Sequence, residues 1–263
     1  MNAYWSFFRI RMKMLAQYRA ATWAAMSTQV FWGIVISMTY RAFYEGAGAD
    51  EPLALNQAVT FLWIGQALLH MMPWNLDKEI EASIRGGHVA YELIRPIHLY
   101  GLWWVRALAQ RMIPMVLRAA PIFIVGSLFF GLQAPSSFDA LLCFVGAVIG
   151  ALALSTSITS LVMISLFWTV SGEGIQRLLP HTTLLLSGLL IPLPLFPSAM
   201  QPFLSWQPFR GVMDIPCRLY TGVIPASEAL QYFLFQWGWT GIFIGVGLYC
   251  MRRAVRRLTI QGG

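Results

Sequence analysis

Charged residues are scarce in this chain. Asp, Glu, Lys and Arg make up 11% of its 263 residues, whereas ordinary soluble domains carry roughly 25%. Hydrophobic residues make up 57%, and they occur in runs that are long enough for membrane helices. This composition excludes an ordinary soluble domain. We therefore expect an all-α integral membrane protein that forms a single domain over residues 1–263.

Motifs for catalysis are also missing. A phosphate-binding loop needs a lysine preceded by glycine, but the two lysines of this chain follow Met12 and Asp77. There is no H-E-x-x-H or G-x-S-x-G motif, and the four histidines are scattered. Cys143, Cys217 and Cys250 have neither the spacing of a zinc site nor that of a disulfide framework. We expect no catalytic residue, no metal site and no cofactor in this chain.

The net charge of +7 is concentrated at the N-terminus, in a central loop and in the C-terminal tail. The tail holds Arg252, Arg253, Arg256 and Arg257. Basic residues beside apolar runs suit anionic lipid headgroups better than nucleic acid. The expected partner is the lipid bilayer, and no nucleic acid is expected.

Six apolar runs are long enough to cross the ~30 Å hydrocarbon core as helices. They cover residues 21–43, 53–72, 112–131, 139–168, 174–191 and 229–250. Basic residues mark the cytoplasmic side of a membrane. Four of them precede the first run, namely Arg9, Arg11, Lys13 and Arg19. The sequence therefore predicts an uncleaved chain with six transmembrane helices, with both termini in the cytoplasm and a cytoplasmic loop over residues 73–111 that contains Arg106 and Arg111.

Residues 1–20 mix charged and aromatic side chains. One helical face would carry Ser6, Arg9, Lys13 and Gln17, and the opposite face Trp5, Phe8, Met12 and Leu15. This pattern is typical of an interfacial helix that lies along the cytoplasmic leaflet. The alternative is a simple polar segment leading into the first span.

The most charged stretch lies at residues 73–96, between the second and third runs. Pro73 ends the preceding helix, and Asn75 is a candidate N-cap. An apolar stripe with a spacing of four residues predicts a short amphipathic helix; it consists of Leu76, Ile80 and Ile84. We expect this stripe to enter a groove on a soluble partner. The alternative is a solvated loop helix that contacts nothing.

The polar residues of the same stretch fit a short helix. Asp77, Glu81 and Arg85 share a second face, on which Glu81 and Arg85 can pair. The Gly86–Gly87 pair predicts a left-handed C-terminal cap.

The segment 192–228 is too apolar for a free loop and too rich in proline for a spanning helix. Its prolines include Pro192, Pro194, Pro197, Pro202, Pro208 and Pro216. Broken backbone at membrane depth must be buried in protein or line a cavity. We expect short re-entrant pieces on the outer side, before the last span.

Several polar residues fall inside the predicted spans. Arg118 either lines a pathway or extends to the inner interface. Glu173 and Arg177 form an i,i+4 pair one turn before His181; the pair either gates a pathway or is a salt bridge at a helix start. The spacing of Gly146 and Gly150, and that of Gly241 and Gly245, permits close helix contact. A run of hydroxyl residues in the fourth span favours packing between helices over a polar cavity wall; it holds Ser155, Thr156, Ser157, Thr159 and Ser160.

Taken together, the chain resembles the permease subunits of type-2 ATP-binding-cassette (ABC) exporters, in particular a subfamily often encoded with an ATPase and a second permease. Three stretches carry the resemblance: the N-terminal interfacial helix, EIEASIRGGHVAYELIRPIH in the central loop, and QPFRGVMDIPCRLYTG before the last span.

The resemblance implies a dimer of permease subunits, either identical or related, on a dimer of cytoplasmic ABC ATPases that bind ATP and Mg. It also implies that residues 74–87 are a coupling helix, with Leu76, Asp77, Glu79, Ile80, Glu81, Ile84, Arg85, Gly86 and Gly87 at the ATPase. Substrate-path candidates are Arg118, His181, Phe196, Phe203 and Trp206, and gating candidates are Glu173 and Arg177.

The expected function is the export of an amphipathic or hydrophobic cargo, such as a drug, a lipid or glycolipid-like molecule, or a peptide, across a bacterial inner membrane. The alternative is an ion-coupled secondary transporter that works without an ATPase. A membrane enzyme acting on lipid is a third possibility, but the sequence offers no nucleophile and base for it. The identity of the cargo and the choice between homodimer and heterodimer stay open.

Overall fold

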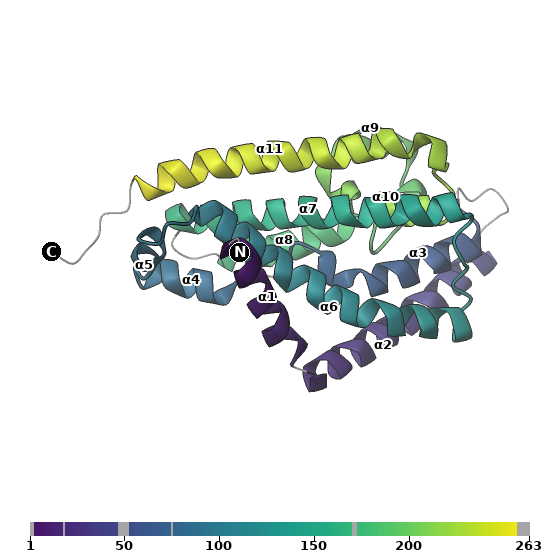
Figure 1. Cartoon of the computed structure of the whole chain (residues 1–263). Coiled ribbons are helices and arrows are strands. Elements are labelled where there is room, and N and C mark those ends of the chain that lie inside the picture. Colours follow the sequence, from purple (N-terminus) through teal and green to yellow (C-terminus); the bar gives the residue numbers. More distant parts are fainter. Residues whose placement is uncertain (1–2, 18, 47–52, 75, 170–172, 257–263) are drawn as a thin grey trace.

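The structure, a computed structural model, describes residues 3–17, 19–46, 53–74, 76–169 and 173–256. All regular elements in these ranges are helices, as predicted. Three of them are long and apolar enough to cross a membrane: α6 (Leu99–Phe129), α7 (Phe138–Thr169) and α11 (Ala229–Val255), the last preceded by the 3-10 turn η5 (Ala226–Glu228). They extend along the length of the molecule, with α11 beside α7 (Figure 1).

Helices α7 and α11 lie close together because two glycines of α7 face α11. A Cβ atom on Gly146 would lie 3.1 Å from the Phe233 ring, and one on Gly150 would lie 2.5 Å from Oε1 of Gln236. The Gln236 side chain is fully buried, and its Nε2 donates to the carbonyl of Ala147 at 2.9 Å and to that of Gly211 at 2.8 Å. The close contact predicted at Gly146 and Gly150 is confirmed. At Gly241 and Gly245 of α11 a Cβ atom would have nothing within 4 Å among the described residues, so the structure shows no close contact at that pair.

The predicted start of the third run was wrong. Helix α6 begins at Leu99 rather than at residue 112, so Arg106 and Arg111 lie inside a helix and not in a loop. Both arginines are buried. The sequence placed them in water because a lone charge is costly inside a protein, whereas the fold supplies each with partners from distant segments.

Three further runs differ from the prediction to different degrees. The run 21–43 is helical in α2 (Arg19–Gly46), which is not among the three helices named above. The run 53–72 is not one helix, because α3 (Leu55–Ala67) is followed by the 3-10 turn η1 (Leu69–Met71). The run 174–191 contains only α8 (Glu173–Leu186), 14 residues and therefore roughly 21 Å long. Soon afterwards the chain turns at Gly188, whose φ is +82°.

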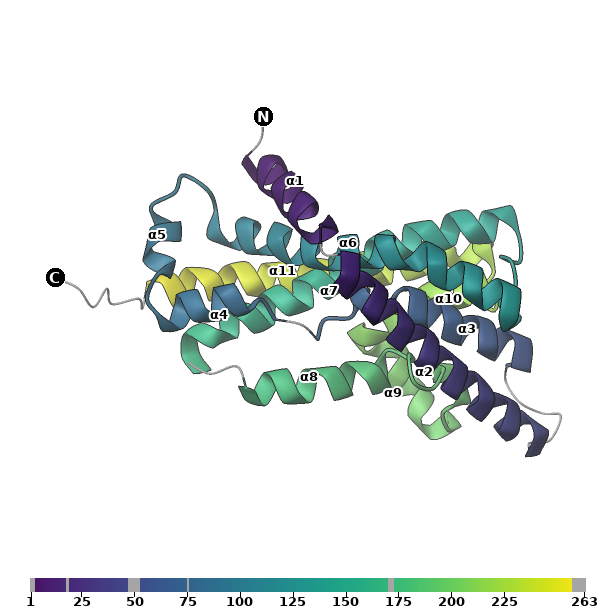
Figure 2. The same ribbon diagram turned by 90° about the horizontal axis from the view of Figure 1, so that it is seen from below.

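The N-terminal helix α1 (Ala3–Ala16) packs on α6 and is inclined to it (Figure 2). Phe8 is buried against Ala109 and Ile113 of α6. The backbone amide of His98 donates to the Tyr4 hydroxyl at 3.0 Å. Trp5 of the predicted apolar face stays exposed, and so do Ile10 and Met14, which lie outside that face. The apolar face predicted for an interfacial helix is therefore only partly used for packing within the chain.

The proline-rich segment is broken into short pieces, as predicted. They are η2 (Leu193–Leu195), η3 (Ser198–Met200), α9 (Gln201–Trp206), η4 (Pro208–Gly211) and α10 (Asp214–Tyr220). Glutamine side chains satisfy the interrupted backbone: Nε2 of Gln201 donates to the carbonyls of Leu193 and Phe196 at 2.9 Å, and Oε1 of Gln207 accepts from the amide of Phe209 at 2.7 Å. Helix α10 is packed against α7.

Candidate functional site

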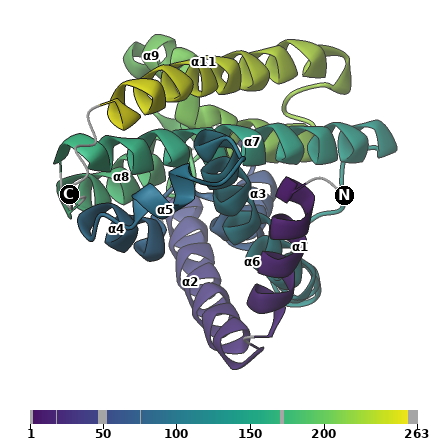
Figure 3. The same cartoon turned by 60° about the vertical axis from the view of Figure 1, so that its left-hand side comes forward.

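Helix α4 (Lys78–Arg85) occupies the predicted coupling segment, at the end of the molecule that also carries α5 (Val89–Leu93) and the C-terminal end of α11 (Figures 1 and 3). Its N-cap is Asp77, whose Oδ1 accepts from the amides of Glu79 at 2.9 Å and Ile80 at 3.4 Å. Asn75, the predicted cap, lies outside the described residues. Asp77 therefore precedes the helix instead of lying on its second face, because its carboxylate satisfies the free amides of the first turn.

Asp77 also holds α4 against α6. Nη2 of Arg106 donates to Oδ1 of Asp77 at 2.8 Å, and Nε of Arg106 pairs with Oδ2. Nε2 of Gln110 donates to the same Oδ2 at 2.6 Å. The side chains of Asp77 and Arg106 are 3% and 8% exposed, so the pair is shielded from water and its two charges compensate one another.

A second carboxylate extends this cluster to α1. Glu79 pairs with Arg106, and its Oε2 lies 2.6 Å from Nη2 of Arg11. The hydrogen bond from Arg11, together with the charge of Arg106, holds the pKa of the Glu79 carboxyl below its ordinary value, although burial acts in the opposite direction. The cluster thus joins α1, α4 and α6.

The apolar stripe of α4 faces this chain itself and not a soluble partner. Ile80 is 1% exposed and lies in one cluster with Trp103 of α6 and Met163 of α7. Leu76 and Ile84 are partly buried against the same cluster. The predicted interpretation of the stripe was wrong, because an amphipathic pattern shows that one face is covered but does not show by what.

The opposite side of the segment is exposed. On α4 the exposed residues include Lys78, Ala82 and Arg85, and just beyond it Tyr91 and Ile94 are 69% and 79% exposed. We call these five residues the docking surface. It combines charge with two large apolar side chains, as protein interfaces commonly do.

Buried contacts with α6 and its neighbours hold the docking surface in place. Val89 is buried in the cluster that contains Ile80, and Nε1 of Trp103 donates to Oε2 of Glu92 at 2.8 Å. The predicted Glu81–Arg85 ion pair is present at 2.8 Å. The predicted left-handed cap is confirmed at Gly87, whose φ is +72°. Segments 76–87 and 89–93 are therefore both fixed on α6.

A second buried cation joins α6 to α7. Arg111 is 3% exposed; its Nε donates to Oγ of Ser155 at 3.1 Å, and Nη1 donates to the carbonyl of Ala107 at 2.8 Å. Nη2 donates to the Thr159 hydroxyl. In the described part of the chain its partners are all neutral oxygens. The predicted role of the hydroxyl run, packing between helices, is confirmed for Ser155 and Thr159.

The predicted pathway and gating residues do not come together. Arg118 on α6 contacts the ring of His70, and Nδ1 of His181 on α8 bonds to the Arg177 carbonyl at 2.8 Å. Phe203 and Trp206 are exposed on α9, and Phe196 is half-buried. The side chain of Glu173 lies outside the described residues, so its pairing with Arg177 stays a prediction.

A cavity of about 450 Å³ lies between α2, the α3–η1 segment and α8. Its walls are mainly apolar and consist of Thr28, Gln29, Trp32, Ile36, Gln66, Leu69, Trp74, Leu184, Leu189 and Leu190. None of the predicted pathway residues is among them. Sequence reasoning missed this cavity because its walls come from segments that are distant in the chain.

A further ion cluster in the outer segment was also missed. Asp214 of α10 is fully buried, and its Oδ2 lies 3.7 Å from Nη2 of Arg210 and 3.5 Å from Nη1 of Arg218. The spacing of these residues at i, i+4 and i+8 is visible in the sequence and could have indicated the cluster.

Comparison with known proteins gives a family match over nearly the whole chain. A family model described as an ABC-2 family transporter protein matches residues 22–262. A search of curated proteins found no matching sequence. The match covers every element described above except α1 and the first residues of α2.

Proposed function

We propose that this chain forms the membrane part of an ATP-driven exporter. The basis is its family, since the chain belongs to the ABC-2 transporter family and is a permease subunit of the ABC-2 type. Members of this family work with an ABC ATPase at a membrane, and the permease itself is not the catalytic component. In this proposal ATP and Mg bind to the separate ATPase dimer and not to this chain. A second permease subunit, either a copy of this chain or a relative, completes the complex.

The proposed topology has six membrane passes with both termini in the cytoplasm. Helices α6, α7 and α11 supply three passes. The others are α2, the α3–η1 segment and α8 with the residues after it, and the outer segment 192–228 forms a re-entrant cap. The basic residues before α2 and after α11 support this orientation. A bacterial inner membrane is the proposed location.

One observation carries the proposed coupling: buried residues attach α4 to α6, while the other side of the segment bears the exposed docking surface. Asp77 and Arg106 tie α4 to α6, so a displacement of the docking surface would move a spanning helix with it. A partner shifts a conformational equilibrium only through different affinities for its two states. We infer that the ATP-bound ATPase dimer binds the docking surface better in one arrangement of α6.

The proposed cargo is amphipathic or hydrophobic. The mainly apolar cavity between α2, η1 and α8 supports this class, since its walls carry no charged side chain. Arg118, His181, Phe196, Phe203 and Trp206 stay candidates for other parts of the pathway. The family membership does not favour the alternative of an ion-coupled secondary transporter.

The test is co-purification with the ATPase encoded by a neighbouring reading frame, followed by transport in vesicles. Tyr91→Ala with Ile94→Ala should weaken ATPase binding roughly tenfold or more, as loss of exposed anchors does at interfaces, and should leave the unfolding midpoint unchanged. Leu230→Ala with Leu234→Ala removes comparably exposed side chains from the other end of α11 and should retain the ATPase. Transport by this chain without any ATPase would contradict the proposal and favour the secondary transporter.

A further inference from the structure

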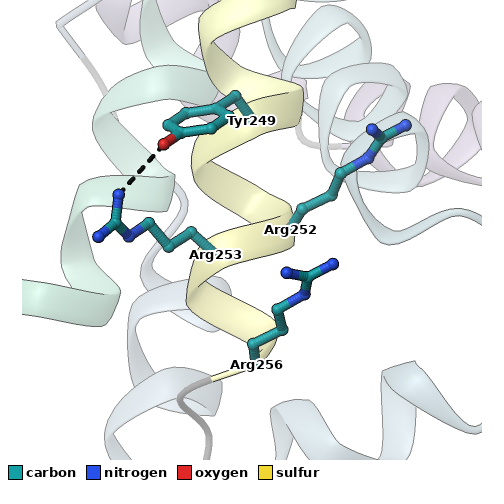
Figure 4. A pocket seen from close by; sticks show the side chains of 4 residues that line it. All are labelled: Tyr249, Arg252, Arg253 and Arg256. Carbon is teal, nitrogen blue, oxygen red and sulfur yellow. Dashed lines mark hydrogen bonds between the residues drawn. The ribbon is translucent and has the colours of Figure 1, made fainter.

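A cavity of about 600 Å³ lies at the C-terminal end of α11 and is lined by Tyr249, Arg252, Arg253 and Arg256. Arg252 and Arg256 extend to the same side of the helix, one turn apart, whereas Arg253 reaches toward Tyr249 (Figure 4). Nη1 of Arg253 donates to the Tyr249 hydroxyl at 3.1 Å. The cavity thus presents three guanidinium groups within two helical turns.

These charges have no carboxylate partner among the residues that the structure describes. Arg252 and Arg256 are like charges at i,i+4, an arrangement that destabilises a helix. The negative end of the helix dipole offsets only about half a charge. Asp77 and Glu79, at the same end of the molecule, already pair with Arg106 and Arg11. An external anion would compensate the remaining positive charge.

The face of α11 that leads to the cavity is apolar and open. Ile242 and Val246 precede Tyr249 at a spacing of four and three residues, and all three side chains are exposed. They share one helical face with Arg253. Since α11 is long and apolar enough to span a membrane, its end lies at headgroup depth, where tyrosine is favoured. An occupant of this face needs an anionic head and an apolar tail.

We propose that this site binds an anionic phospholipid. Its phosphate accepts hydrogen bonds from Arg252 and Arg256, with Arg253 and Tyr249 at its flank, and its acyl chains lie along Val246 and Ile242. Guanidinium groups suit this role because their planar donors bind a phosphate through two oxygens at once. The apolar track favours a lipid over free inorganic phosphate.

The experiment measures the unfolding midpoint of the purified full-length chain in neutral detergent, with phosphatidylglycerol, phosphatidylcholine or inorganic phosphate added. Phosphatidylglycerol should raise the midpoint, and the other two additives should not. In a titration the triple variant R252Q/R253Q/R256Q should bind phosphatidylglycerol on the order of a hundredfold more weakly, given the contribution of each basic residue near an anionic surface. An equal shift with inorganic phosphate would overturn the assignment to a lipid.

The matched control is R9Q/K13Q/R41Q, which removes the same charge from exposed positions elsewhere. It should retain the response to phosphatidylglycerol, and an equal loss would mean that only net charge matters. Val246→Asn should weaken binding of long-chain phosphatidylglycerol more than that of a short-chain form. If the triple variant keeps lipid binding but loses the ATPase, the cluster is a protein-docking surface and the inference is wrong. The lipid measurement uses neither ATPase nor cargo, so its outcome is independent of the proposed exporter function.

Discussion

Arg106 of α6 and Asp77 at the N-terminus of α4 form an ion pair with both side chains buried, and Nη2 lies 2.8 Å from Oδ1. The two residues are 29 positions apart in the chain. Because Asp77 also caps α4, the same carboxylate starts the helix and fixes it to a candidate membrane span. The orientation of the docking surface relative to α6 depends on this contact.

The first prediction concerns this pair. Asp77→Asn keeps a capping side chain but leaves the Arg106 charge without its buried partner, so unfolding should become easier by about 3 kcal/mol. Arg106→Gln should have a similar effect, because it leaves the Asp77 carboxylate buried without its cationic partner. The double variant should lose less than the sum of the two, because no unpaired charge is left. Thermal unfolding of the four proteins measures this coupling, and strictly additive losses would contradict it.

The second prediction concerns pH. The pKa of Glu79 is lower in the folded protein than its ordinary 4.5, so its ionised form stabilises the fold above that value, and the stabilisation is lost as the pH falls through the lowered pKa. Glu79→Gln should therefore lower the unfolding midpoint at pH 7 but make little difference near pH 3. The side chain is 66% exposed, so the effect at pH 7 should stay below about 1 kcal/mol. A difference that does not change with pH would refute the assignment.

The third prediction concerns Arg111, whose partners are neutral. Ser155→Ala with Thr159→Val removes two acceptors from a buried cation and should cost about 3 kcal/mol. Arg111→Met removes the charge itself and should cost much less, since replacing buried ions by apolar side chains is often neutral. In the Arg111→Met background, the loss of both hydroxyls should cost less, because only the hydrogen bond from Ser155 to the carbonyl of Met71 is then lost. Unfolding in detergent tests this, and equal losses in both backgrounds would show that the hydroxyls act independently of Arg111.

The fourth prediction compares two glycines in the middle of long helices. Gly150→Ala would push the new Cβ into Gln236, which donates two hydrogen bonds in the interior, and should destabilise the protein by roughly 1–3 kcal/mol. Gly241 of α11 has nothing within 4 Å of a Cβ, so Gly241→Ala should be neutral or stabilising by up to about 1 kcal/mol. The two unfolding midpoints should therefore move in different directions, and equal shifts would mean that the α7–α11 contact is looser than described.

The sequence by itself determined the features that depend on local pattern. Long uninterrupted apolar runs placed both ends of α7 within one residue and the start of α11 correctly, although α11 continues to Val255, beyond its predicted end at residue 250. The prolines after residue 191 required the short pieces from η2 to α10. The apolar spacing of α4 and the glycine at position 87 defined a short helix with a left-handed end. In each case the signal is a continuous stretch of sequence and depends on no contact with a distant segment.

Only the tertiary structure decided how the charged and amphipathic segments are covered. The charges of Arg106 and Arg111 indicated a loop, yet both residues lie inside α6. The fold makes this possible because Asp77 pairs with Arg106, and Ser155 and Thr159 accept hydrogen bonds from Arg111. The stripe at Ile80 could have met a partner protein, but Trp103 and Met163 cover it. A buried charge needs a polar or charged partner, and an apolar face needs to be covered. The packing of the whole chain decides which distant residues do this.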